Sequence, residues 1–299
     1  MEKKRISDYK ALARMTMKQH YGTMLLAVLI MIVIQTVITQ IFYGLSHTGS
    51  YVMLGAYFVL ELLVSLIILG PLSIGLSGFF VSCISGEYDL KNIFRPFRTN
   101  LTNTVKVYFF MQLKLFLWMF IPWLIGMGIV VAAVCIFSSG FAAARLSEFA
   151  YVFTDILFGN TDSLGTRETE IFAAVYLGLL ALSFLFMIPG IIKSFEYAMI
   201  PYIAAENADI SVKEAFRRTK LMMKGNKLRY FGLNFSFIGW LLLGMLIFIF
   251  GMVFFMPYLY TATAHFYVDA KSRLEGGGSF SDGYGGNYRD MDKGDTFGL

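Results

Sequence analysis

The sequence predicts an all-α protein, a polytopic helical membrane bundle with six transmembrane helices and basic amphipathic segments between them. Hydrophobic residues make up 57% of the 299 residues and charged residues only 15%, whereas soluble domains have about 25% charged residues. The mean hydropathy is +0.64. Several apolar runs reach the roughly 20 residues that a helix needs to cross a bilayer. This composition excludes a water-soluble enzyme, a collagen and a disulfide scaffold.

The first two spans are expected at residues 21–43 and 51–80. The first run contains no charge, is too long for a signal peptide and lacks an Ala-x-Ala site after it, so it is an uncleaved span. The second run is interrupted only by Glu61 and by Gly70-Pro71. As one helix it would be about 45 Å long. We therefore expect it to tilt, to kink at Pro71 or to extend beyond the lipid.

The third and fourth spans are expected at residues 107–137 and 171–192. An external loop, residues 138–170, connects them. Glycine is abundant near the C-terminus, and such a stretch cannot bury enough apolar surface to fold alone. The expected organisation is therefore an integral membrane domain over residues 1–270 and a disordered tail over residues 271–299.

The last apolar run, residues 230–268, is too long for a single span. Two short helices near 230–247 and 251–268 fit a bilayer better, with Gly251 as the local breaker between them. Six spans place the C-terminus on the same side as the N-terminus. A single long helix gives five spans and is the alternative.

Basic residues predict the orientation of the spans. Lys and Arg are concentrated in residues 1–20, 81–106 and 193–229, and they are scarce in residues 44–50 and 138–170. Because Lys and Arg resist translocation, the basic segments are expected in the cytoplasm, together with the N-terminus.

Two of the basic segments resemble one another. Ser7 and Ser211 occupy equivalent places in residues 6–18 and 210–224, each after an Ile and four residues before an Ala. Both serines suit the N-cap of a helix, and a basic amphipathic stretch follows each. Duplication and chance both explain so short a match.

Basic amphipathic helices lie in the headgroup layer and are attracted to anionic lipid. The two similar segments therefore supply candidate contacts to anionic lipid or to a membrane-protein partner. The alternative is that their charges only fix the topology and anchor the chain at the interface. The candidate residues are Arg14, Lys18, Arg217, Arg218 and Lys224.

Glu61 forms a second candidate site, because a carboxylate in lipid is costly and by default marks a functional position. If the first two spans pack antiparallel, Gln35 lies at a similar depth and can hydrogen-bond to it. The rival interpretation places Glu61 in external water, beyond the lipid-buried part of the span.

Sequence motifs for catalysis are absent. The three histidines are scattered, the two cysteines have no partner spacing, and neither a P-loop nor a nucleophile elbow occurs. We therefore expect no enzyme activity, no cofactor and no metal. Nucleic acid is not an expected partner either, since the basic residues flank apolar runs, as membrane topology requires.

Several short motifs occur in a specific order along the chain. They are Ile6-Ser7-x-x-x-Ala11-x-Ala13-Arg14, Tyr197-Ala198-Met199-Ile200-Pro201-Tyr202, Ala215-Phe216-Arg217-Arg218-Thr219, Met223-Lys224-Gly225, Ser236-Phe237-Ile238-Gly239-Trp240, Pro257-Tyr258 and Phe266-Tyr267-x-Asp269. This combination resembles the DUF975 family of uncharacterised bacterial multi-pass membrane proteins. The resemblance covers most of residues 5–270 and implies a location in the bacterial cytoplasmic membrane. It implies no functional residue, because the family has no assigned activity.

The expected function is a membrane-embedded binding or accessory protein that engages the lipid bilayer, anionic lipid or a protein partner. The abundance of interfacial basic residues without a catalytic constellation favours it. The alternative is a small solute transporter that uses Glu61 within the membrane.

Overall fold

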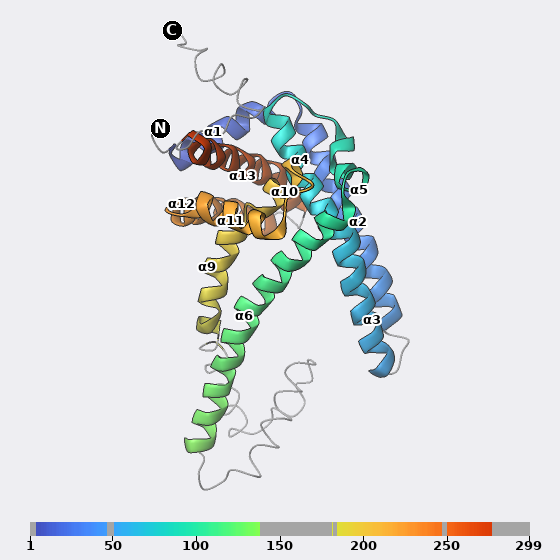
Figure 1. Ribbon diagram of the computed structural model, residues 1–299, viewed down its shortest axis with the longest axis vertical. Helices are drawn as coiled ribbons and strands as arrows, with labels where there is room; N and C mark the ends of the chain where they lie inside the picture. Colours follow the sequence, from blue (N-terminus) through green and yellow to red (C-terminus); the bar gives the residue numbers. More distant parts are fainter. Residues whose placement is uncertain (1–3, 47–50, 138–180, 182–183, 247–249, 277–299) are drawn as a thin grey trace. The chain divides into compact units, whose positions relative to one another are not determined.

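The computed structural model describes residues 4–46, 51–137, 181, 184–246 and 250–276, and every regular element in them is a helix (Figure 1). The all-α class is therefore confirmed for this part of the chain. The chain divides into two compact units. Unit 1 comprises residues 1–112 and 195–299, and unit 2 comprises residues 113–194.

Three stretches of helix in the described residues are long and apolar enough to cross a membrane. They lie in α2 (Tyr21–Ser46), in the continuous run of α3 (Tyr51–Val64), η1 (Ser65–Leu69) and α4 (Gly70–Ile84), and in α6 (Leu101–Phe137). Protein leaves many of their apolar side chains uncovered, as at Val33, Leu63 and Leu124. Outward-facing apolar residues along long helices are expected where lipid replaces water, so the structure indicates a membrane protein.

The second predicted span contains a π-helical turn directly before Pro71. There the Gly70 N–H donates to the carbonyl of Ser65, five residues back. Pro71 has no N–H, and in an α-helix its ring would crowd the carbonyl of Ile67. A π turn relieves such a conflict without ending the helix. The irregularity expected at Pro71 therefore takes this form, and the helix continues to Ile84.

The third span begins earlier than predicted, at Leu101 instead of Val107. The side-chain oxygen of Asn100 accepts a hydrogen bond from the Asn103 N–H at 3.0 Å, which is the interaction expected of an N-cap. The first turn of this helix is polar, so a count of apolar residues placed the start of the span too late.

Two short helices, η2 (Leu90–Phe94) and α5 (Arg95–Arg98), connect α4 to α6. η2 lies directly against α4 at Gly75. A Cβ atom on Gly75 would lie only 1.8 Å from the carbonyl oxygen of Ile93, so only glycine permits this approach.

Three helices follow the part of the chain that the structure leaves undescribed. They are α9 (Ile188–Tyr197), α10 (Ile200–Glu206) and α11 (Val212–Met223). The predicted external loop lies outside the described residues, and so does most of the fourth predicted span. Within unit 2, α9 packs closely on α6, since a Cβ on Gly190 would lie 2.8 Å from the carbonyl oxygen of Trp118.

The last apolar run contains two helices, α12 (Lys227–Leu246) and α13 (Phe250–Gly276). Neither is among the described stretches that are long and apolar enough to cross a membrane, so the two predicted spans stay a prediction. Gly251 lies inside α13 and does not break the chain. Residues 271–276 also belong to α13, although the sequence assigned them to the tail. Side-chain contacts described below hold this last turn and a half in place.

The core of unit 1 surrounds α13, which packs on α1, α2, α4 and α12. Residues 261–267 are buried throughout. The rings of Phe237 and Phe255 lie 5.3 Å apart, as do those of Tyr230 and Phe266. Because the later residue of α12 contacts the earlier residue of α13, the two helices run antiparallel.

One of the two predicted N-caps is confirmed. The Ser211 hydroxyl accepts a hydrogen bond from the backbone N–H three residues along, at 3.3 Å, and so begins α11. The prediction for Ser7 is wrong, because α1 (Ile6–Met17) already contains it. There the Asp8 carboxylate accepts from the Arg5 N–H at 2.7 Å. Asp8 thus reaches back from the first turn to the residue before the helix, which is a different interaction from the N-cap predicted for the serine.

Candidate functional site

The three basic segments that the sequence places on one side of the membrane meet in unit 1. The Tyr88 hydroxyl donates to the carbonyl of Thr16 at 3.3 Å, and the Tyr88 ring stacks on His20 with 3.9 Å between the ring centroids. The first and second segments are thereby joined. We call them the N-terminal segment, the middle segment and the third segment, comprising residues 4–20, 85–106 and 195–229.

Asparagines join the middle segment to the third segment. The Asn103 amide donates to the carbonyls of Ala208 and Ile210 at 2.7 and 2.8 Å. The neighbouring Asn100 amide donates to the Asp209 carboxylate at 2.7 Å. Satisfied amide groups fix the position of the turn between α10 and α11 against the start of α6.

A buried polar network joins the N-terminal segment to the third segment and to α13. The Arg229 guanidinium donates to the Lys4 carbonyl and, at 3.0 Å, to the Tyr9 hydroxyl. Tyr9 is only 1% exposed, and its hydroxyl donates to the Asp269 carboxylate, which also pairs with Arg273. Buried charges are tolerated only when paired and hydrogen-bonded, so this network ties α1, α12 and α13 together.

Protein covers the apolar face of α11. The Thr219 hydroxyl donates to the Glu196 carbonyl at 2.8 Å, and the Glu196 carboxylate pairs with Lys227. α11 packs on α10 and α13. The sequence predicted which residues form the apolar face, but protein rather than lipid covers them. The buried residues of α11 are Ala215, Phe216, Thr219, Met222 and Met223.

Exposed cations outnumber exposed anions among the described residues of unit 1. The exposed basic side chains are those of Arg5, Arg14, Lys18, Lys91, Arg95, Arg98, Lys106, Lys213, Arg217, Lys220 and Lys224. The exposed acidic side chains are those of Asp8, Glu87, Asp89, Asp209 and Glu275. The exposed basic side chains come from all three segments, so joining the segments gathers positive charge.

Glu214 neutralises part of this charge. Its carboxylate accepts from Arg217 at 2.6 and 2.7 Å and from Arg218 at 2.9 Å. These hydrogen bonds, above all the pair from Arg217, lower the pKa of Glu214 to about 2. Arg14 and Lys224, in contrast, take part in no ion pair within the described residues, and neither does Lys18.

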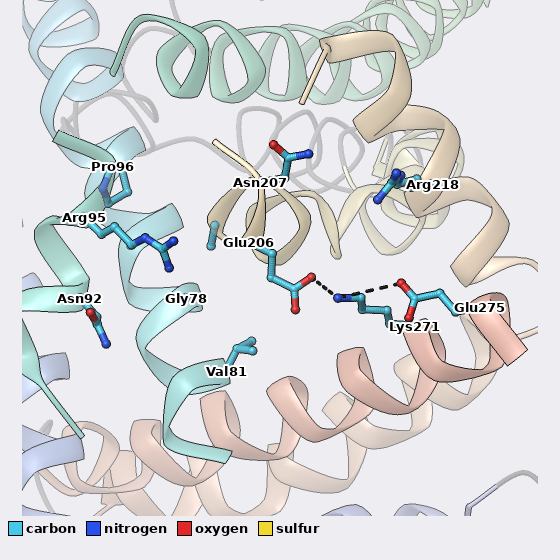
Figure 2. A pocket seen from close by; sticks show the side chains of 12 residues that line it. Gly78, Val81, Asn92, Arg95, Pro96, Glu206, Asn207, Arg218, Lys271 and Glu275 are labelled. Atoms are coloured by element: carbon cyan, nitrogen blue, oxygen red, sulfur yellow. Dashed lines mark hydrogen bonds and ion pairs between the residues drawn. The ribbon is translucent and has the colours of Figure 1, made fainter. Parts of the chain in front are cut away.

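A pocket of about 370 Å³ opens in unit 1 beside the last turns of α4. Figure 2 shows Arg95 on one side and Arg218 on the other, with Glu206 between them. Small residues on α4 leave room for it. The lining residues are Gly75, Gly78, Val81, Asn92, Arg95, Pro96, Ala205, Glu206, Asn207, Arg218, Lys271 and Glu275.

Some charged side chains of this pocket have protein partners and others do not. The Glu206 carboxylate accepts from the Tyr267 hydroxyl at 2.8 Å and from the Lys271 ammonium at 2.6 Å. The same ammonium lies 4.0 Å from the Glu275 carboxylate. Within the described residues, no hydrogen bond or ion pair involves the Arg95 guanidinium. The pocket therefore combines a fixed acid–base pair with an exposed cation that has no partner among the described residues.

Metal binding has no support in the part of the chain that the structure describes. No three His, Cys, Asp or Glu side chains are grouped there in a way that could hold an ion. Lys271 already lies between the pocket's two carboxylates, Glu206 and Glu275. The arrangement instead presents donors and acceptors suited to a polar organic ligand.

The match to a known family is extensive. Residues 1–273 match the family described as "Protein of unknown function (DUF975)". The chain belongs to this family. The resemblance predicted from the order of its motifs is thereby confirmed. No curated protein and no solved structure matches this DUF975 chain. The matched residues include all three basic segments and almost the whole pocket lining.

In this DUF975 protein, Glu61 and Gln35 lie on neighbouring helices. Glu61 is half-buried on α3, and Gln35 is exposed on α2. Within the described residues no hydrogen bond joins the two side chains, and Glu61 has no ion pair. A functional role for either residue stays a prediction.

Sequence reasoning named Arg218 as a candidate contact but missed the other residues of the pocket. Lys271 and Glu275 fell in the predicted tail, although their four-residue spacing is that of a helical ion pair. Glu206 ends the short helix α10 between two predicted spans, and the sequence analysis did not single it out. Arg95 was counted as one of many basic residues. The four-residue spacings of Asp269–Arg273 and Lys271–Glu275 were the signals that could have extended α13.

Proposed function

We propose that this DUF975 protein is a multi-pass protein of the bacterial cytoplasmic membrane that binds anionic lipid headgroups through the three joined basic segments. The observation that carries the proposal is that these segments meet and present a surplus of exposed cations. Each Lys or Arg near an anionic leaflet adds about 1 kcal/mol of attraction. The apolar face of α11 is already covered, so binding rests on charge rather than on insertion of that face.

Contacts at both ends of the α12–α13 hairpin support an even number of membrane crossings. Arg229 near the start of α12 and Arg273 near the end of α13 both reach the Tyr9 hydroxyl, at 3.0 and 3.4 Å. The hairpin thus returns to the side from which it starts. Six crossings follow if the hairpin traverses the bilayer, and four if it only dips into it. With the N-terminus cytoplasmic, residue 273 is cytoplasmic too.

Cysteine labelling tests this topology. A cysteine placed at Leu246, the last residue of α12, is expected to react with an impermeant maleimide from outside intact cells if six spans are correct. A cysteine placed at Lys220, in the third segment, is expected to react only after lysis and is the control. Reaction at Lys220 from outside would contradict the proposed orientation.

Lipid titration tests the proposed binding. Phosphatidylglycerol is expected to raise the melting temperature of the detergent-purified protein more than phosphatidylcholine does, and 0.5 M salt is expected to reduce the difference. Replacing Arg14, Lys18 and Lys224 together by Gln should remove about 1 kcal/mol of attraction per residue.

The matched control keeps the charge at the same positions, as Arg14→Lys with Lys18→Arg and Lys224→Arg, and should respond like the native protein. Equal responses to the two lipids in the native protein would refute binding to anionic lipid. An acidic protein partner would then become the better explanation of the basic surface.

A second candidate function, solute transport, is favoured by Glu61. This carboxylate is half-buried in a helix that is long and apolar enough to cross a membrane, and no described residue pairs with it. Such a carboxylate is a default site for proton or cation coupling. Glu61→Gln should abolish pH-gradient-driven uptake in proteoliposomes, whereas Gln35→Glu should leave a response to the gradient. Unchanged uptake of every tested solute in Glu61→Gln would remove this candidate.

A further inference from the structure

We infer that the pocket of unit 1 binds a phosphoester that also carries a primary ammonium group, the chemistry of phosphoethanolamine. The inference deepens the proposed function, because it adds one selective headgroup site to a generally basic surface. The pocket lining carries both signs of charge, on Arg95, Arg218 and Lys271 and on Glu206 and Glu275. A purely anionic ligand would be repelled by the carboxylates, and a purely cationic one by the arginines.

Two guanidinium groups, from Arg95 and Arg218, line opposite walls of the pocket. The Arg95 guanidinium has no partner among the described residues, and Figure 2 shows it on the same side of the pocket as Asn92. A planar guanidinium matches a phosphate with two parallel hydrogen bonds, and such charge-assisted bonds are about twice as strong as neutral ones. Arg218 uses its Nε atom for Glu214, so its terminal nitrogens stay available on the opposite wall.

The pocket's charged acceptors are the carboxylates of Glu206 and Glu275. Lys271 lies 2.6 Å from Glu206 but 4.0 Å from Glu275, so the Glu275 carboxylate keeps the larger unused acceptor capacity. Among the residues that the structure describes, no aromatic side chain lines the pocket. A quaternary ammonium group is usually held by an aromatic cage, whereas a primary ammonium has three N–H donors for carboxylates. The lining therefore favours ethanolamine over choline.

The position of the pocket along α4 suits a headgroup. Gly75, Gly78 and Val81 lie near the end of a candidate span of 30 residues, Gly55–Ile84. Such a helix is about 45 Å long, and the hydrocarbon core is about 30 Å thick. The last turns therefore extend into the headgroup layer. Both a phospholipid headgroup and free phosphoethanolamine in the adjoining water can reach the pocket.

Calorimetric titration of the full-length protein in detergent tests the ligand chemistry. Soluble phosphoethanolamine is expected to bind at least tenfold more tightly than phosphocholine or inorganic phosphate. Arg95→Gln should weaken this binding about tenfold or more, the loss expected for one charge-assisted contact. Arg98→Gln is the matched control, because Arg98 is an exposed arginine on the same short helix that does not line the pocket. It should change the affinity less than twofold.

Glu275→Gln tests the ammonium half of the site. It should bring the affinities for phosphoethanolamine and phosphocholine within about threefold of one another, while leaving the affinity for inorganic phosphate unchanged or higher. Equal effects of Arg95→Gln and Arg98→Gln would overturn the inference, as would equal binding of phosphoethanolamine and phosphocholine by the native protein. Absence of binding by all three soluble probes, together with equal retention of the two lipids in the next experiment, would also overturn it.

Nanodiscs distinguish the two sources of the ligand. If the source is lipid, native protein should retain phosphatidylethanolamine over phosphatidylcholine through detergent extraction, and Arg95→Gln should lose that preference. If the source is soluble, only the calorimetric preference should appear. A phosphatidylglycerol response that persists without either preference refutes the pocket site and leaves the basic surface intact. A preference for phosphoethanolamine or its lipid without any phosphatidylglycerol response refutes binding by the basic surface and leaves the pocket site intact.

Discussion

Replacing Gly75 by Ala tests the close packing of the middle segment on α4. The added Cβ would lie 1.8 Å from the Ile93 carbonyl oxygen and 2.7 Å from its carbonyl carbon. Ordinary contact needs about 3.5 Å, so η2 would have to retreat by roughly 1.5 Å. The opposing atoms belong to the backbone of a fully buried residue, so no side-chain rotation can relieve the overlap.

The magnitude follows from two opposing terms. Overpacking costs typically about 1–3 kcal/mol and sometimes more, whereas alanine gains up to about 1 kcal/mol over glycine within a helix. Because backbone must move, we expect the upper part of that range and a net loss of about 2 kcal/mol. Gly239→Ala is the matched control, since no atom lies within 4 Å of its added Cβ in α12. It should be neutral or slightly stabilising.

Thermal unfolding in detergent measures the difference, with tryptophan fluorescence as the signal. At about 2–4 °C per kcal/mol for a chain of this size, Gly75→Ala should melt roughly 4–8 °C below the native protein. A half-life at fixed temperature gives the same ranking where unfolding is irreversible. A melting temperature of Gly75→Ala equal to that of Gly239→Ala would show that η2 does not lie on α4 as described.

The remaining predictions concern the contacts that hold the segments together. Asp269→Asn should lower thermal stability by about 3–5 kcal/mol, because it leaves a buried guanidinium unpaired, whereas Tyr9→Phe should cost only about 1 kcal/mol; equal losses would contradict the network. The carboxyl of Glu214 has its pKa lowered to about 2, so its stabilising contribution is complete above the ordinary carboxyl pKa and declines as the pH falls below it. The stability difference between the native protein and Glu214→Gln should therefore shrink from pH 5 to pH 3, and a constant difference would oppose this reasoning. Ser211→Ala should cost about 1 kcal/mol in the same unfolding assay, because Ser211 caps α11. Ser7→Ala should cost almost nothing, because Ser7 caps no helix.

Local patterns along the sequence predicted much of this fold. Apolar length alone located α2, the α3–α4 run and α6, which are long and apolar enough to cross a membrane. It also located the apolar run that contains α12 and α13. The apolar face of α11 followed from helical periodicity. Boundaries failed where polar residues open or close a helix, as at Leu101 and after residue 268. Those turns are held by Asn103 and Lys271, and their partners are distant in sequence.

The candidate site was harder to anticipate. Its residues come from α4, the middle segment, α10, α11 and α13, and only the folded chain brings these together. Charge counting found the basic segments but treated them as separate linkers. The asparagine and tyrosine contacts that join them carry no periodic signal, because a single amide reaching a backbone carbonyl leaves no pattern in composition. Long-range polar contacts of this kind are visible only in the structure.

The bond between Tyr9 and Asp269 joins residues separated by 260 positions, and this separation sets an order for assembly. During synthesis the first helix leaves the ribosome long before its partner exists, so α1 cannot reach its final place until the last helix has been made. Early intermediates would keep α1 loosely attached and accessible to proteases. A chain interrupted before residue 269 would keep its first membrane segments but would lack the Tyr9–Asp269 bond. Its N-terminal helix would then stay exposed to the proteases that degrade incomplete chains.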